Sequence, residues 1–137
     1  NIMLKHGKTR IIDFQDARMG PIQYDLVSLV KDSYVDISPG MGKGLLEYYL
    51  EQRLSEGFEK VVWDKFIEVY EIQSIQRCFK ACGSFASFFN LRQDKRYLKY
   101  LPGTLQRVKK SIECFPKFKL FDKILGDNGF YSNKFEF

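Results

Sequence analysis

The sequence predicts a mainly α-helical protein with a short β-hairpin at its N-terminal end. Apolar residues recur at helical spacing over most of the chain after Gly20-Pro21, and two short strand-like runs precede that point. The chain has 137 residues, of which 45% are hydrophobic, so it is long enough to bury one core. We therefore expect one domain, made of a hairpin (1–14), a helical body (22–126) and a polar, loosely docked or disordered tail (127–137).

The hairpin is predicted from residues 1–4 and 9–14, which flank a turn containing Gly7. This pairing would place Asn1 close to Asp13. Amide and carboxylate oxygens are hard ligands of the kind that Mg²⁺ takes together with substrate phosphates. The alternative interpretation is that Asp13 only caps the turn that follows, because aspartates are common in turns.

Five helices are expected in the body, because each segment carries apolar residues at helical spacing. Between the first two lies Asp36–Gly44, which we predict to be a linker. Its Gly-Met-Gly-Lys-Gly run does not have the spacing of a phosphate-binding loop, and no strand precedes it. The expected helices cover about 22–30, 43–55, 62–91, 104–115 and 118–125.

The third and longest expected helix, 62–91, contains a face of small residues. Cys82, Gly83 and Ala86 lie on this face, which would let another helix approach closely. Glycine is unfavourable inside a helix, so Gly83 should have a packing reason. On the following segment, Leu105 and two further apolar residues, Val108 and Ile112, are expected to face the core.

The three cysteines, Cys78, Cys82 and Cys114, do not form a metal-binding pattern. The one histidine, His6, lies far from them in the hairpin turn. We expect all three to be buried, reduced thiols.

The net charge of +5 admits an anionic partner. The basic residues are scattered, however, and the nearest approach to a cluster is Lys109, Lys110, Lys117 and Lys119. Nucleic acid is therefore not expected as a partner, and a solvated basic face is the simpler interpretation. No apolar run has the length of a signal peptide or a membrane span, which favours the cytoplasm.

Several stretches resemble the aminoglycoside phosphotransferase and choline kinase-like family. They are Asn1-Ile2-Met3-Leu4, Ile11 to Ala17 (Ile-Ile-Asp-Phe-Gln-Asp-Ala), Gly20-Pro21 and Tyr24-Asp25-Leu26. Residues 76–85 and 94–102 are similar to one branch, the bacterial kinases that phosphorylate N-acetylmuramate or N-acetylglucosamine at the anomeric position. The resemblance extends to about Val108. It implies the C-terminal lobe of the protein kinase-like fold, ATP and Mg²⁺ as cofactors and a sugar as acceptor.

The resemblance also implies roles for individual residues. Asp13 matches the aspartate that binds the metal on the ATP phosphates, and Asn1 matches the asparagine of the catalytic loop. Asp25 matches an aspartate that braces this loop. Candidates for contact with the acceptor are Asp16, Tyr24 and Arg77.

Arg77 has two possible roles at this stage. It is either a buried cation aimed at the Asp13 end of the site or at a sugar, or a surface residue paired with Glu68 or Glu71.

One departure from the family pattern limits the expected activity. In the kinase motif H-R-D-x-x-x-x-N, the catalytic aspartate lies five residues before the asparagine, and this sequence begins at that asparagine. The glycine-rich loop and lysine of the N-terminal lobe are also missing. We therefore expect a fragment that is inactive alone. The alternative is a non-catalytic helical binding module, in which Asp13 and Asp16 are turn caps and a basic surface binds an anionic partner.

Overall fold

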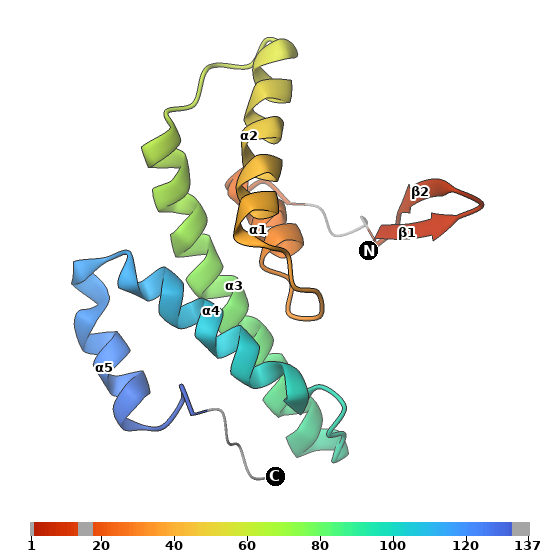
Figure 1. The fold of residues 1–137 in the computed structure, drawn as a ribbon. Helices are drawn as coiled ribbons and strands as arrows, with labels where there is room; N and C mark the ends of the chain where they lie inside the picture. Colours follow the sequence, from red (N-terminus) through yellow and green to blue (C-terminus); the bar gives the residue numbers. More distant parts are fainter. Residues whose placement is uncertain (1, 14–17, 133–137) are drawn as a thin grey trace.

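The computed structural model describes residues 2–13 and 18–132, and within them it is mainly helical with one hairpin (Figure 1). This confirms the predicted fold class. The elements are β1 (Ile2–Lys5), β2 (Lys8–Ile11), α1 (Gln23–Val30), α2 (Pro39–Ser55), α3 (Trp63–Arg92), α4 (Leu101–Glu113) and α5 (Lys119–Asp127), with short 3₁₀ turns at Leu98–Tyr100 and Pro116–Phe118.

The hairpin forms where the sequence predicts it. β1 and β2 pair antiparallel, with Ile2 opposite Ile11. The two turn residues, His6 and Gly7, have φ of 51° and 71°, the left-handed conformation that matches the twist of a tight hairpin. In the described part of the chain, β1 and β2 contact each other and no helix, and the hairpin stands beside the helical body (Figure 1).

The expected linker over Asp36–Gly44 was wrong from Pro39 onward, because α2 begins there. Ser38 caps this helix: its Oγ accepts a hydrogen bond from the Met41 N–H at 3.3 Å. Pro39 follows at the first helical position, where its fixed φ suits the helix and its missing N–H costs nothing. The cap and the proline therefore outweigh the three glycines of the first turns.

Gly42 also has a packing reason to be in α2. A Cβ at this position would lie 2.9 Å from Cγ1 of Val30, which is closer than carbon atoms approach in proteins. The glycine thus allows α2 to lie close against the end of α1.

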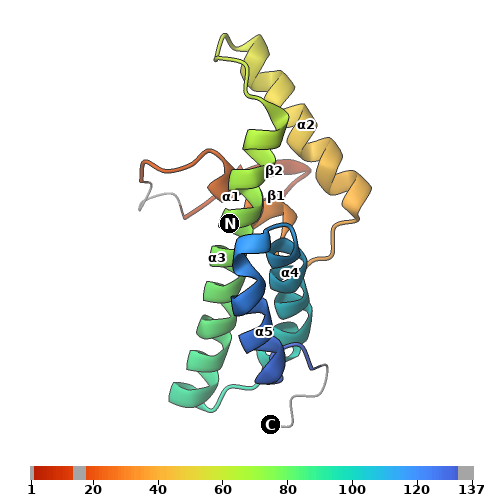
Figure 2. The same cartoon turned by 90° about the vertical axis from the view of Figure 1, so that its left-hand side faces the viewer.

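The helix α3 is the centre of the molecule and packs against both α1 and α4. Figure 2 shows α4 alongside the second half of α3, with α5 against α4. The predicted core face of α4 is confirmed, since Leu105, Val108 and Ile112 are all buried. Buried side chains form three groups along α3: Val27, Leu46, Phe66 and Tyr70; Cys78, Val108, Ile112 and Leu125; and Cys82, Phe85, Leu98, Leu101 and Leu105.

A polar network joins three helices within this apolar body. Nζ of Lys31, just after α1, lies 3.4 Å from Oε1 of Glu71 on α3. The Ser111 hydroxyl of α4 is hydrogen-bonded to the other oxygen of Glu71 and lies 3.1 Å from the Ser74 hydroxyl. Because these groups are half-buried or buried, each depends on the others for its hydrogen bonds.

The chain after α5 returns to the helices. The Tyr131 hydroxyl donates a hydrogen bond to Asp122 at 2.7 Å, and the Gln106 side chain donates to the Tyr131 carbonyl at 3.2 Å. Residues up to Ser132 therefore dock on α4 and α5, and the remainder of the predicted tail lies outside the described residues.

Two expectations about side-chain packing were wrong. Gly83 is exposed and a Cβ there would meet open space, so no helix packs closely on it. Cys78 and Cys82 are buried as expected, but Cys114 is exposed, because it is the residue that follows α4. Within residues 2–13 and 18–132, no helix combines the length and apolar character that a membrane crossing requires.

Candidate functional site

Asp13 lies just beyond the end of β2, where the chain leaves the hairpin. It is exposed and has φ of 62°, a left-handed conformation that aspartate tolerates better than most residues. An exposed carboxylate can reach a hydrated metal ion without losing the energy of desolvation. Asn1 and Asp16 lie outside the described residues, so the predicted closeness of Asn1 to Asp13 stays a prediction.

Tyr24 and Arg77, two of the candidate acceptor residues, lie together between α1 and α3. Cζ of Arg77 is 4.2 Å from the centre of the Tyr24 ring. In the described part of the chain Arg77 has no ion pair with Glu68 or Glu71, and Glu71 is instead paired with Lys31. The stacked arrangement is a cation–π contact, which holds the guanidinium in one plane.

Arg77 lines a pocket of about 250 Å³ between α1, the turn that follows it and α3. This volume is slightly below the usual range for small-molecule sites, so the pocket would hold a small ligand or part of one. The turn contributes Lys31 to Tyr34, which the sequence analysis did not select. The pocket is lined by Val27, Ser28, Lys31, Asp32, Ser33, Tyr34, Arg77, Cys78, Ala81, Ser84 and Phe85.

The charged groups of this pocket differ in how they are compensated. Lys31 pairs with Glu71. One oxygen of Asp32 accepts hydrogen bonds from the N–H groups of Tyr34 and Val35, the second at 3.2 Å, which fixes the turn.

The hydroxyl and thiol groups of the pocket are held in their neutral forms. Burial raises the pKa of Tyr34, with smaller contributions from Tyr97 and Asp32. Burial also raises the pKa of Cys78. Tyr34 is therefore a hydrogen-bond donor at neutral pH, and Cys78 is a thiol rather than a nucleophilic thiolate.

Asp25 lies in the first turn of α1 and is exposed. Because no described helix contacts β1 or β2, the described residues do not bring Asp25 to the hairpin. Asp13 is not among the described residues that line the pocket of Arg77. The candidate site is thus seen as two parts, a carboxylate on the hairpin and a polar pocket on the helical body.

In the described part of the chain, no group of three or more histidine, cysteine, aspartate or glutamate side chains could hold a metal ion. A metal at Asp13 would therefore need ligands beyond these residues, as a nucleotide-bound ion obtains from phosphates and water.

A larger groove of about 910 Å³ runs along the end of α3 and the start of α4. Its walls are mostly apolar, among them Phe79, Leu91 and Phe130, and Lys80 and Arg92 are its charged residues. None of its described lining residues is a carboxylate, and burial raises the pKa of its cysteine, Cys82, to about 12, so this side chain is a thiol at neutral pH.

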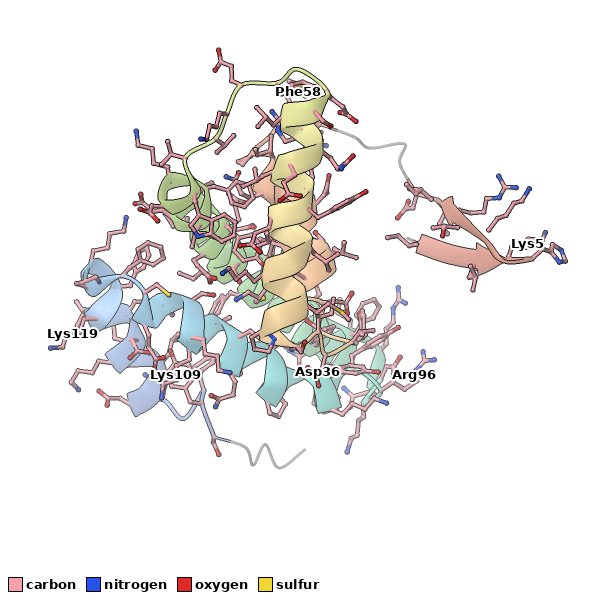
Figure 3. The ribbon with its side chains drawn as sticks, turned by 45° about the horizontal axis from the view of Figure 1, so that its top comes forward. Lys5, Asp36, Phe58, Arg96, Lys109 and Lys119 are labelled. Atoms are coloured by element: carbon pink, nitrogen blue, oxygen red, sulfur yellow. The ribbon has the colours of Figure 1, made fainter. Side chains whose placement is uncertain are left out.

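Several basic residues of the described chain lie far apart or have acidic partners. Lys5, Arg96 and Lys119 lie at three separate edges of the molecule in Figure 3. Lys109 has an acidic partner, Glu113, at 3.9 Å, and lies over the Tyr131 ring. Dispersed and partly compensated lysines are typical of a solvated face.

Residues 1–61, which include the hairpin, Asp13 and α1, match the model of the phosphotransferase enzyme family. These residues are thus similar to this family, and the mainly helical fold with an N-terminal hairpin is the fold class that the resemblance in the sequence implied.

Three relatives carry the same name, N-acetylmuramate/N-acetylglucosamine kinase. The one from Neisseria meningitidis is 32% identical, over 93% of this chain and 40% of the relative. Those from Pseudomonas putida and Pseudomonas aeruginosa are 26% and 25% identical, over 93% and 91% of this chain and 38% and 37% of the relatives. The chain therefore spans about two fifths of the length of the relatives that it matches. No solved structure matches it significantly.

Proposed function

We propose that the chain is the acceptor-binding lobe of an ATP-dependent phosphotransferase that acts on a sugar of the N-acetylmuramate or N-acetylglucosamine type. The main support is the family match over residues 1–61, which includes the exposed Asp13. Because the relatives are longer, we assign the nucleotide-binding lobe and the catalytic aspartate to the rest of such a protein. We propose that this reaction takes place in the cytoplasm, because its substrates would be ATP and a free sugar.

In this proposal Asp13 and Asn1 hold the Mg²⁺ ion on the ATP phosphates. The donor set fits, because a carboxylate and an amide oxygen are ligands that Mg²⁺ accepts beside phosphate and water. The ion supplies positive charge that neutralises the phosphoryl group during transfer. Asp13 can take this part because its carboxylate is exposed and its backbone conformation is defined. Asp25 would support the loop that carries Asn1.

The acceptor is assigned to the pocket beside Arg77. Tyr34 and Ser33 can donate hydrogen bonds to sugar oxygens, and Asp32 can accept from a sugar hydroxyl. Phe85 adds an apolar wall. A small number of placed polar groups around an apolar wall is typical of small-molecule sites. Asp16, which lies between the hairpin and α1 in the sequence, is the remaining candidate for acceptor contact.

The experiment is to replace Asp13 in the complete protein that carries this chain. Asp13→Asn should weaken Mg²⁺-dependent ATP binding by more than about 10- to 100-fold, the loss that even an indirect supporting residue of a metal site produces. Isothermal titration measures the affinity with and without Mg²⁺. The helical circular dichroism should not change, because Asp13 lies outside the helices.

Asp127→Asn is the matched control, since it removes one exposed carboxylate at the end of α5. It should leave ATP binding unchanged. If Asp13→Asn also leaves ATP binding unchanged, the metal site is wrongly assigned. Binding of nucleic acid or anionic lipid that falls steeply with salt, with no response to ATP, would favour the helical binding module instead.

A further inference from the structure

We infer that Arg77 binds a carboxylate of the acceptor, and that it makes the pocket selective for an anionic sugar over a neutral one. This inference rests on the proposed function, and it assigns the chemical property by which the pocket distinguishes acceptors.

The first observation is that the guanidinium of Arg77 is held against an aromatic ring but has no acidic partner among the described residues. It is half-buried and stacked on Tyr24, and among the described residues it has neither an ion pair nor a hydrogen-bond acceptor. Arg96 and Arg107, by contrast, each pair with an aspartate. A stacked guanidinium keeps its edge N–H groups free, and two of them match the two oxygens of a carboxylate.

The second observation is the state of the other charges in the pocket. Lys31 is neutralised by Glu71, which also accepts from Ser111. Asp32 is held by two backbone N–H groups of its own turn. Of the pocket-lining cations that the structure describes, Arg77 is therefore the one without an acidic partner.

The third observation is that the pocket suits a sugar in its remaining groups. The Tyr34 hydroxyl is neutral, and the Ser33 hydroxyl lies in the same turn. These groups and the carboxylate of Asp32 can hydrogen-bond to hydroxyl groups but cannot neutralise an anion. A ligand that satisfies the whole pocket would carry hydroxyl groups together with one carboxylate.

The two sugars of the proposed function differ in this property. N-acetylmuramate has a lactyl ether that ends in a carboxylate, and N-acetylglucosamine has a hydroxyl group at that position. A hydrogen bond between charged partners contributes more than one between neutral groups. The inference therefore predicts that Arg77 contributes to the affinity for N-acetylmuramate and little to the affinity for N-acetylglucosamine.

The test measures dissociation constants of both sugars for the complete protein by isothermal titration. Arg77→Ala should weaken N-acetylmuramate binding by about 10- to 100-fold. The same substitution should change N-acetylglucosamine binding by less than about 3-fold, since only a neutral contact is lost. Arg77→Lys keeps the charge but not the paired N–H groups, so it should give an intermediate loss for N-acetylmuramate alone.

Arg92→Ala is the matched control. Arg92 lies on the same helix and is stacked on Phe88, with 5.1 Å from Cζ to the ring centre, but it does not line this pocket. It should leave both affinities unchanged. Circular dichroism and the denaturation midpoint of each variant show whether the fold is kept.

Three results would overturn the inference: equal losses for both sugars, no loss for either, or a wild-type protein that binds neither. Weaker binding of inorganic phosphate or ATP, with N-acetylmuramate unaffected, would assign Arg77 to phosphate instead and would also overturn it.

Phosphate transfer to both sugars, measured separately, tests the proposed function. If transfer occurs without a selective effect of Arg77→Ala, the function stands and the inference fails. If the selective effect occurs without transfer, the inference stands and the function fails.

Discussion

At the scale of single residues, the structure places two of the predicted acceptor residues together and adds neighbours that the sequence analysis did not select. Tyr24 and Arg77 were selected from the sequence, and the structure stacks one on the other. The sequence analysis did not select Ser33 and Tyr34, which lie in the turn after α1. Apolar periodicity does not show which side chains of a turn line a pocket. A signal was present in the polar run Lys31 to Ser33, which directly follows an apolar helix.

The contact between Tyr24 and Arg77 makes a prediction about the ring. Tyr24→Leu should lower the affinity of the complete protein for N-acetylmuramate by about 2- to 5-fold, because a cation–π contact near the surface contributes about 0.5–1 kcal/mol. Tyr24→Phe keeps the ring and should bind as the wild type does. Titration with both sugars measures the effect. A loss in Tyr24→Phe as large as in Tyr24→Leu would show that the hydroxyl, not the ring, is what matters.

At the scale of elements, periodicity predicted the long helix and the core face of α4, because these depend on apolar spacing alone. Periodicity did not predict the start of α2, where glycines disfavour a helix and a capping residue favours one. Pro39 and the glycines after it look like a loop, yet Ser38 and Pro39 are also a helix start. Gly42 is needed because any larger residue would collide with Val30 of another helix. A local sequence pattern cannot show a contact between two helices.

Two glycines of α2 give a matched prediction. Gly42→Ala should destabilise the protein by about 1–3 kcal/mol, because the added Cβ collides with Val30 and forces α1 and α2 apart. Gly44→Ala meets open space in the same helix. It should stabilise the protein by up to about 1 kcal/mol, the difference in helix propensity. Urea denaturation followed by circular dichroism measures both, and equal effects would contradict the close packing of α1 and α2.

At the scale of the whole molecule, the helices are joined by Glu71 as well as by the apolar core. Glu71→Ala removes the acceptor of Lys31 and Ser111 together. It should lower the free energy of unfolding by about 1–3 kcal/mol, because partly buried donors are left unpaired. Glu68→Ala changes an exposed residue of the same helix and should stay within about 0.5 kcal/mol of the wild type. Guanidinium denaturation compares the two. If they lose the same amount, the network is not a link between the helices.

The molecule as a whole also shows which part of the site lay beyond sequence reasoning. The hairpin, its turn and Asp13 were predicted from local pattern, since strand pairing across a two-residue turn is a local property. The position of the hairpin relative to the helices is a long-range property, and here β1 and β2 contact no helix. How the two parts of the proposed site meet therefore stays a prediction, because Asn1 and Asp16 lie outside the described residues.

The isolation of the hairpin affects how Asp13 would bind a metal. An isolated two-stranded hairpin is marginally stable in water, and within residues 2–13 and 18–132 no tertiary contact with a helix supports β1 and β2. Their amide protons should therefore exchange with solvent much faster than those in the middle of α3. Ordering the carboxylate of Asp13 for metal binding then costs conformational entropy. Contacts that another part of the protein or a ligand makes with the hairpin must compensate for this cost, so the metal affinity at Asp13 will depend on those contacts.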